Sequence, residues 1–71
     1  MKDLKLNFMT SYGAARFIAY NTIMDFLTDF ENRTIDTEGT MIQAVFFEKG
    51  TRTKNFNTMQ ELYDFCREII K

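Results

Sequence analysis

Residues 40–70, TMIQAVFFEKGTRTKNFNTMQELYDFCREII, contain the clearest structural signals in this chain of 71 residues. The segment 40–48 is rich in β-branched and aromatic residues, which predicts a strand. Its apolar side chains alternate toward both faces, so we expect a central strand that is covered on both sides. Lys49 and Gly50 predict a tight hairpin turn, and the segment 51–56 is expected to return as an edge strand of threonine and basic residues.

A helix is predicted to close the chain. Thr58 and Glu61 have the spacing of a capping box, in which a hydroxyl and a carboxylate satisfy free amides at a helix start. The apolar residues that follow recur at helical spacing on one side of the segment: Met59, Leu62, Tyr63, Cys66, Ile69 and Ile70. This spacing predicts an amphipathic helix over residues 59–70.

In the first half of the chain, the apolar residues recur with two different spacings. Apolar and polar residues alternate over 4–8, which predicts a short strand. Residues 12–32 then show helical spacing with an apolar arc of about half the circumference, and Thr10 or Ser11 could cap such a helix. We therefore expect one long helix there, and Ile35 could add a short strand before the next turn.

Together these elements predict one α+β domain over residues 1–71. We expect a small antiparallel sheet of about three strands with two helices on one face. The predicted order is strand, helix, hairpin, helix.

The composition argues against an enzyme and against a metal protein. The chain has no histidine and one cysteine, Cys66, so a zinc site, an internal disulfide and an activated thiol are not expected. Ser11 is the only serine, and the scattered glycines form no phosphate loop. We expect no catalytic residue, no metal and no cofactor.

The N-terminal residues carry charges at short intervals and have no apolar signal-peptide core. A lone cysteine fits a reducing compartment. We therefore expect a cytoplasmic protein without a membrane partner.

Acidic residues are concentrated between residues 25 and 38, where Arg33 is the only base. On the predicted long helix, Asp25 and Asp29 would share a face in the C-terminal half, where the helix dipole disfavours carboxylates. Ile18 would lie among polar residues on the same face. This pattern predicts a protein-binding surface that docks on a basic partner, with the following residues: Ile18, Asp25, Asp29, Glu31, Asp36 and Glu38. The alternative interpretation is an ordinary solvated face.

The hairpin offers a second candidate site. Lys49, Arg52 and Lys54 are interleaved with aromatic residues, as in proteins that hold single-stranded nucleic acid. Three cations make a weak electrostatic footprint, and basic residues also protect an edge strand from aggregation. A homodimer is a third alternative, because so short a chain gains stability from association.

In its overall pattern the chain resembles the small anti-defence proteins of phages and mobile elements, such as anti-CRISPR proteins. The residues that carry the resemblance are the segment Met41–Phe47, the turn Lys49-Gly50, Phe56, the cap Thr58–Glu61 and the helix from Met59 to Ile70. It implies a non-enzymatic inhibitor in the host cytoplasm. Its partner would be another protein or a ribonucleoprotein complex that handles nucleic acid.

Overall fold

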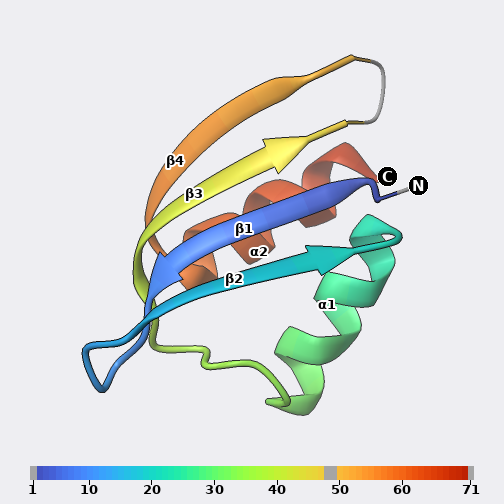
Figure 1. The fold of residues 1–71 in the computed structure, drawn as a ribbon. Coiled ribbons are helices and arrows are strands. Elements are labelled where there is room, and N and C mark those ends of the chain that lie inside the picture. Colours follow the sequence, from blue (N-terminus) through green and yellow to red (C-terminus); the bar gives the residue numbers. More distant parts are fainter. Residues whose placement is uncertain (1, 48–49, 71) are drawn as a thin grey trace.

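The computed structural model describes residues 2–47 and 50–70. Its elements are β1 (Leu4–Met9), β2 (Ala15–Tyr20), α1 (Ile23–Asn32), β3 (Thr40–Phe46), β4 (Arg52–Thr58) and α2 (Met59–Ile69). The four strands form one antiparallel sheet in the order β2-β1-β3-β4. Both helices lie on the same face of this sheet (Figure 1).

The α+β class and the antiparallel sheet are confirmed, but the prediction of a single helix over 12–32 is wrong in its first half. Residues 15–20 form β2, which pairs with the outer side of β1, and α1 begins only at Ile23. The apolar positions of the sequence ARFIAY fit a strand as well as a helix. Without β2, the backbone groups along one side of β1 would lack partners, and pairing satisfies them.

The turn between β1 and β2 explains why Thr10 caps no helix. Its Oγ1 accepts a hydrogen bond from the Ala14 amide at 2.9 Å, and Gly13 supplies the positive φ of 86° that this turn requires. The residue that caps α1 is Thr22, whose hydroxyl accepts from the Asp25 amide at 3.1 Å.

The chain consists of two similar halves, each a β-hairpin followed by a helix. Their inner strands, β1 and β3, pair at the centre, so the strand order is symmetric about this pair. The helix starts match as well. In the first half the Thr22 hydroxyl accepts a hydrogen bond from the Asp25 amide, and in the second half the Thr58 hydroxyl accepts one from the Glu61 amide. The hydrogen bond to the Thr58 hydroxyl that the capping box predicts for α2 is therefore confirmed, and α1 begins with the same kind of hydrogen bond.

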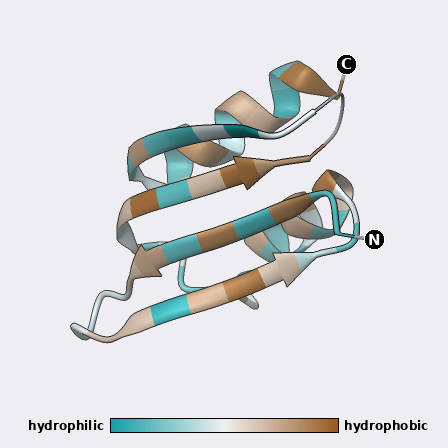
Figure 2. Cartoon of the chain, turned by 45° about the horizontal axis from the view of Figure 1, so that its top comes forward, coloured by the Kyte–Doolittle hydropathy of each residue, from teal (hydrophilic) through white to brown (hydrophobic). Residues whose placement is uncertain are grey.

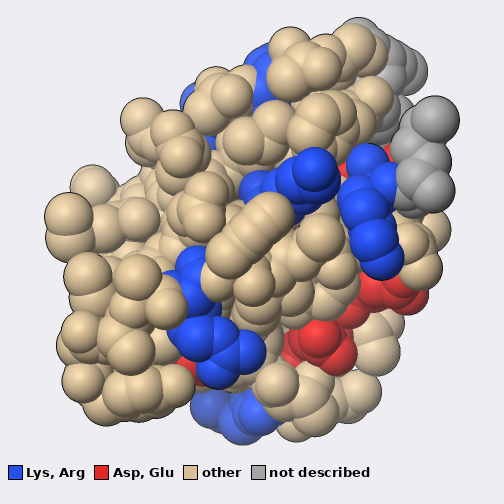
Figure 3. Space-filling view, in the orientation of Figure 1, with Lys and Arg blue, Asp and Glu red and all other residues tan. Residues whose placement is uncertain are grey.

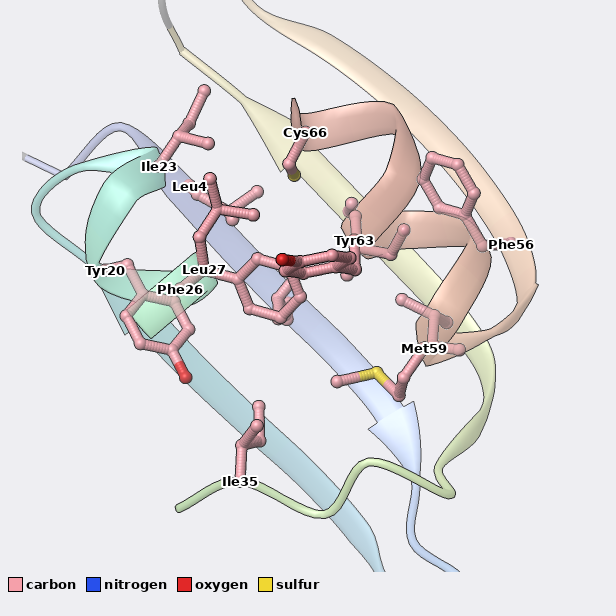
Figure 4. Packing of buried hydrophobic residues seen from close by; sticks show 14 of the residues in the cluster. Leu4, Tyr20, Ile23, Phe26, Leu27, Ile35, Phe56, Met59, Tyr63 and Cys66 are labelled. Atoms are coloured by element: carbon pink, nitrogen blue, oxygen red, sulfur yellow. The ribbon is translucent and has the colours of Figure 1, made fainter. Parts of the chain in front are cut away.

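The core lies between the sheet and the helices. The inner strands contribute Leu4, Leu6, Ala44 and Phe46, and side chains from both helices meet them (Figure 4). Hydrophobic and hydrophilic residues alternate along β1 because its opposite side faces away from the helices (Figure 2). The expectation that β3 is covered on both faces is wrong, since the helices cover only one.

The loop between α1 and β3 contributes Ile35, which is buried against the core without forming a strand. Within residues 2–47 and 50–70, neither helix has the length and apolar character needed to cross a membrane.

Candidate functional site: the sheet surfaces and the acidic helix

Charge is divided between the sheet and the helices. The four strands contain no Asp or Glu and carry Lys5, Arg16, Arg52 and Lys54. The two helices carry a single base, Arg67, and the following acids: Asp25, Asp29, Glu31, Glu61, Asp64 and Glu68. The bases of these elements therefore lie mainly on the strands and the acids on the helices, and three of the four strand bases, Arg16, Arg52 and Lys54, point to the helix side of the sheet.

Asp25 does not have the unfavourable position that the sequence suggested. Because α1 begins at Ile23, Asp25 lies in the first turn, where the helix dipole favours a carboxylate. Its amide is held by Thr22 and its side chain is exposed. The dipole argument for a functional acidic face therefore does not apply to Asp25.

Asp29 is an internal hydrogen-bond acceptor. Its Oδ2 accepts from the Tyr20 hydroxyl at 2.9 Å and its Oδ1 from the Thr34 hydroxyl at 2.8 Å. These bonds connect α1 to β2 and to the following loop.

Glu31 and Asp36 also serve the fold. Glu31 accepts a hydrogen bond from the Tyr63 hydroxyl, which joins the two helices. Asp36 accepts from the Ser11 amide and hydroxyl and from the Glu38 amide at 2.8–3.0 Å. The hydrogen bond from the Ser11 amide is the main reason why the pKa of Asp36 lies below its ordinary value. Glu38 itself has an exposed side chain.

The predicted acidic surface is thus divided. Asp25 is exposed near the start of α1 and Glu38 in the loop beyond its other end, while the carboxylates between them are engaged in the fold. Ile18 is not part of such a surface. It lies on β2 opposite Leu6 and packs partly buried against the core, because residues 15–20 form a strand.

We expect the free energy of unfolding to fall as pH rises above about 10, and Tyr20→Phe to reduce that fall. Burial, followed by the hydrogen bond to Asp29, raises the pKa of Tyr20 above its ordinary value. A raised folded-state pKa gives stability that is complete below the unfolded pKa and is lost as pH rises through the folded one. Urea unfolding between about pH 8 and pH 11 measures this change.

The matched control is Tyr12→Phe, because Tyr12 is 71% exposed. Some alkaline loss should remain in both variants, since the hydrogen bond to Glu31 also raises the pKa of Tyr63. Identical pH profiles for the wild type and Tyr20→Phe would contradict this account.

Arg52 and Lys54 lie on β4 and point to the helix side, opposite Phe46 and Ala44 of β3. The Arg52 guanidinium is 5.7 Å and the Lys54 Nζ 5.3 Å from the centroid of the Phe65 ring. We call these two cations and this ring the basic edge. Lys49, the third predicted cation, lies outside the described residues.

The uncovered side of the sheet is formed by two transverse rows, set by the strand registers. One row is Ala19, Lys5, Val45 and Thr53, and the other is Phe17, Asn7, Gln43 and Asn55. The Lys5 Nζ is 5.3 Å from the centroid of the Phe47 ring, which follows β3. We call these nine residues the open face.

Two properties distinguish the open face. Phe17, a large aromatic side chain, is 53% exposed. Lys5 is the only charged residue in the two rows. Figure 3 shows this side as mainly uncharged residues with several separate blue groups among them, and with the red atoms mainly near the border where α1 lies. The sequence pointed to this surface only through the apolar residues on both sides of β3.

A shallow pocket of about 340 Å³ lies between α1 and α2, lined by Phe30, Glu31, Arg33, Thr37, Gln60 and Tyr63. The Phe30 and Tyr63 rings stack at 4.4 Å between centroids. Glu31 and Arg33 bring opposite charges to the lining, and Glu31 is already bound by Tyr63. The lining of the pocket therefore selects neither anionic nor cationic ligands.

Cys66 is fully buried on α2, and burial raises the pKa of its thiol to about 12. Such a thiol is unreactive at neutral pH. Among the residues that the structure describes, no group of three His, Cys, Asp or Glu side chains could hold a metal ion.

Comparison with protein-family models, with curated proteins and with solved structures finds no match to this chain. Inferences about its function therefore rest on the residues and their geometry.

Proposed function

We propose that this chain is a non-enzymatic protein-binding domain that docks through the open face. The observation that carries the proposal is a side of the sheet that the helices do not cover, where Phe17 is half exposed and Lys5 is the only charge in the two rows. Cores of protein interfaces are enriched in aromatic residues and depleted of charge in the same way.

The chemistry of the open face also specifies its partner. Asn7, Gln43 and Asn55 form a row of carboxamides that can donate and accept hydrogen bonds beside Phe17. Lys5 is the only charge in the two rows, and its cation favours a carboxylate of the partner beside the apolar contacts. The partner is therefore a protein surface with an apolar centre and an acidic group that meets Lys5.

Two other occupants are less favoured by the charges. Single-stranded nucleic acid needs several phosphate contacts, and the two rows supply only Lys5. Of the three aromatic residues near the hairpin cations, Phe46 and Phe56 are buried and Phe47 is half-buried. A second copy packed face to face would bring the same cation from both copies into one interface without an acid on the strands to balance it.

We further propose, from the resemblance to anti-CRISPR proteins, that the partner belongs to a nucleic-acid-handling complex of a host. The first binding test therefore uses a panel of purified CRISPR effector complexes. Absence of binding to every complex in the panel would reject the inhibitor role.

The test of the docking surface is Phe17→Asp, compared with the matched control Met24→Asp. Met24 is 56% exposed but lies on α1, away from the open face. If Phe17 is a central contact, its loss should weaken partner binding by about 30-fold, and the control should change it little. Biolayer interferometry measures both affinities, and thermal unfolding confirms that both variants fold.

Three results would contradict the proposal. Unchanged binding by Phe17→Asp would exclude the open face, and loss of binding in a double variant Asp25→Lys and Glu38→Lys would return the interface to the acidic residues. Oligonucleotide binding that Phe17→Asp abolishes would assign the open face to nucleic acid. A dimer in light scattering that Phe17→Asp dissociates would assign it to a second copy.

A further inference from the structure

The outer edge of β4 is a second surface with a defined chemistry. In the described residues β4 pairs only with β3, and it is the last strand of the sheet. Figure 1 shows no segment of the chain beyond it. Every second residue of such an edge strand directs its amide and carbonyl away from the sheet, where an added strand can bond to them.

The side chains beside this edge are cationic and are held in position. Arg52 and Lys54 are exposed, and both lie over the Phe65 ring at 5.3–5.7 Å. The ring in turn packs against Phe46 and Phe56 at 5.4–5.5 Å between centroids. Because the aromatic contacts restrain the two cations, less side-chain entropy remains to be lost when they bind an anion.

We propose that β4 binds an extended acidic segment of a partner protein as an additional strand. The segment's main chain bonds to the free edge, and its acidic side chains meet Arg52 and Lys54. Since these two residues lie two positions apart on one side of the strand, the bound segment carries carboxylates at every second position. This surface is separate from the open face and does not depend on it.

Two alternatives fit the edge less well. A nucleic acid would satisfy the cations but lacks the peptide groups that match the free edge. A second copy that paired β4 with β4 would oppose cations to cations, and pairing β4 with β2 would oppose them to Arg16 on a strand that also lacks acids. A partner segment with alternating carboxylates satisfies both the main chain and the charges.

The experiment titrates the whole protein with two synthetic peptides of equal length and composition. In the first peptide, glutamate occupies every second position, and valine and threonine occupy the positions between. In the second peptide, the same residues are rearranged so that the glutamates are adjacent. Amide chemical shifts in NMR spectra report both the affinity and the site. We expect the alternating peptide to bind more tightly and to shift the amides of residues 52–58.

Variants separate the contributions. Arg52→Gln with Lys54→Gln should weaken binding of the alternating peptide by about fivefold to tenfold, while Lys5→Gln on the open face should leave it unchanged. N-methylation of the peptide amides that face β4 should abolish binding, because it removes the donors of the added strand. Phe17→Asp should also leave peptide binding intact, so this test is independent of docking by the open face.

Several results would overturn the proposal. These are equal affinity for both peptides, shifts confined to the open face, unchanged affinity in the Arg52 and Lys54 double variant, and tolerance of N-methylation. Displacement of the peptide by a single-stranded oligonucleotide of higher affinity would assign the basic edge to nucleic acid instead.

Discussion

Phe26→Ala is expected to lower the free energy of unfolding by about 3–5 kcal/mol, the largest effect of any substitution considered. The Phe26 side chain is fully buried, and its ring contacts those of Tyr20 and Phe30 at 5.8 and 6.2 Å between centroids. Truncation removes these contacts and leaves a cavity between α1 and β2. A domain of this length has about 4–10 kcal/mol in total, so the variant would lose much of its stability.

Urea unfolding followed by circular dichroism measures this loss. The matched control is Met24→Ala on the same helix, where the side chain is 56% exposed, and its effect should stay within about 0.5 kcal/mol. A loss below about 1 kcal/mol for Phe26→Ala would show that the packing between α1 and the sheet is not as tight as the structure indicates.

Gly39→Ala is expected to cost about 1–3 kcal/mol through overpacking. A Cβ at this buried position would come within 2.6 Å of Cδ2 of the Phe8 ring and 3.3 Å of the Met9 carbonyl oxygen. Phe8 is itself buried in the core, so its ring has little room to move. Chemical denaturation of both proteins under the same conditions measures the difference.

A double-mutant cycle with Phe8→Leu isolates the clash. Phe8→Leu alone should destabilise the protein, but in the Gly39→Ala background its cost should shrink or vanish, because the smaller side chain admits the new methyl group. Additive effects of the two substitutions would show that the cost at Gly39 arises elsewhere.

The two proposals place binding on the sheet and not on the acidic helix that the sequence favoured. This change follows from the fold, because Asp29, Glu31 and Asp36 hold α1, the loop after it and the β1–β2 turn in place. Their spacing in the sequence alone does not reveal these hydrogen bonds. Asp25, Glu31 and Glu38 are exposed, but the carboxylate of Glu31 accepts the hydrogen bond from Tyr63.

The second half of the chain was predicted well because its local signals agree. Thr58 caps α2 as its spacing with Glu61 indicated, and β3 and β4 follow the β-branched and alternating residues. The first half was predicted less well because the apolar residues of 15–20 fit the spacing of a strand and also that of a helix. A second hydroxyl-capped start, Thr22 with Asp25, was the signal in the sequence that could have separated strand from helix there.

The candidate sites were visible only in part. The basic residues Arg52 and Lys54 lie near aromatic rings as expected, and the Lys54 Nζ is 5.9 Å from the centroid of the Phe56 ring. The ring that both cations contact, however, belongs to Phe65 on α2. On a helix over 12–32, Phe17 would belong to the apolar arc, but it is exposed because residues 15–20 form β2. Contacts between segments distant in sequence cannot be derived from periodicity.

The sequence by itself determined the class of the fold, the helix at the C-terminal end, the hairpin before it and the lack of histidine for metal or acid–base chemistry, because these depend on local spacing and composition. The tertiary structure decided that residues 15–20 form a strand, that three acidic side chains are internal acceptors and that one side of the sheet is bare. The physical reason is that backbone pairing along β1 and the packing of both helices on one face depend on the whole chain, and these interactions override local preference.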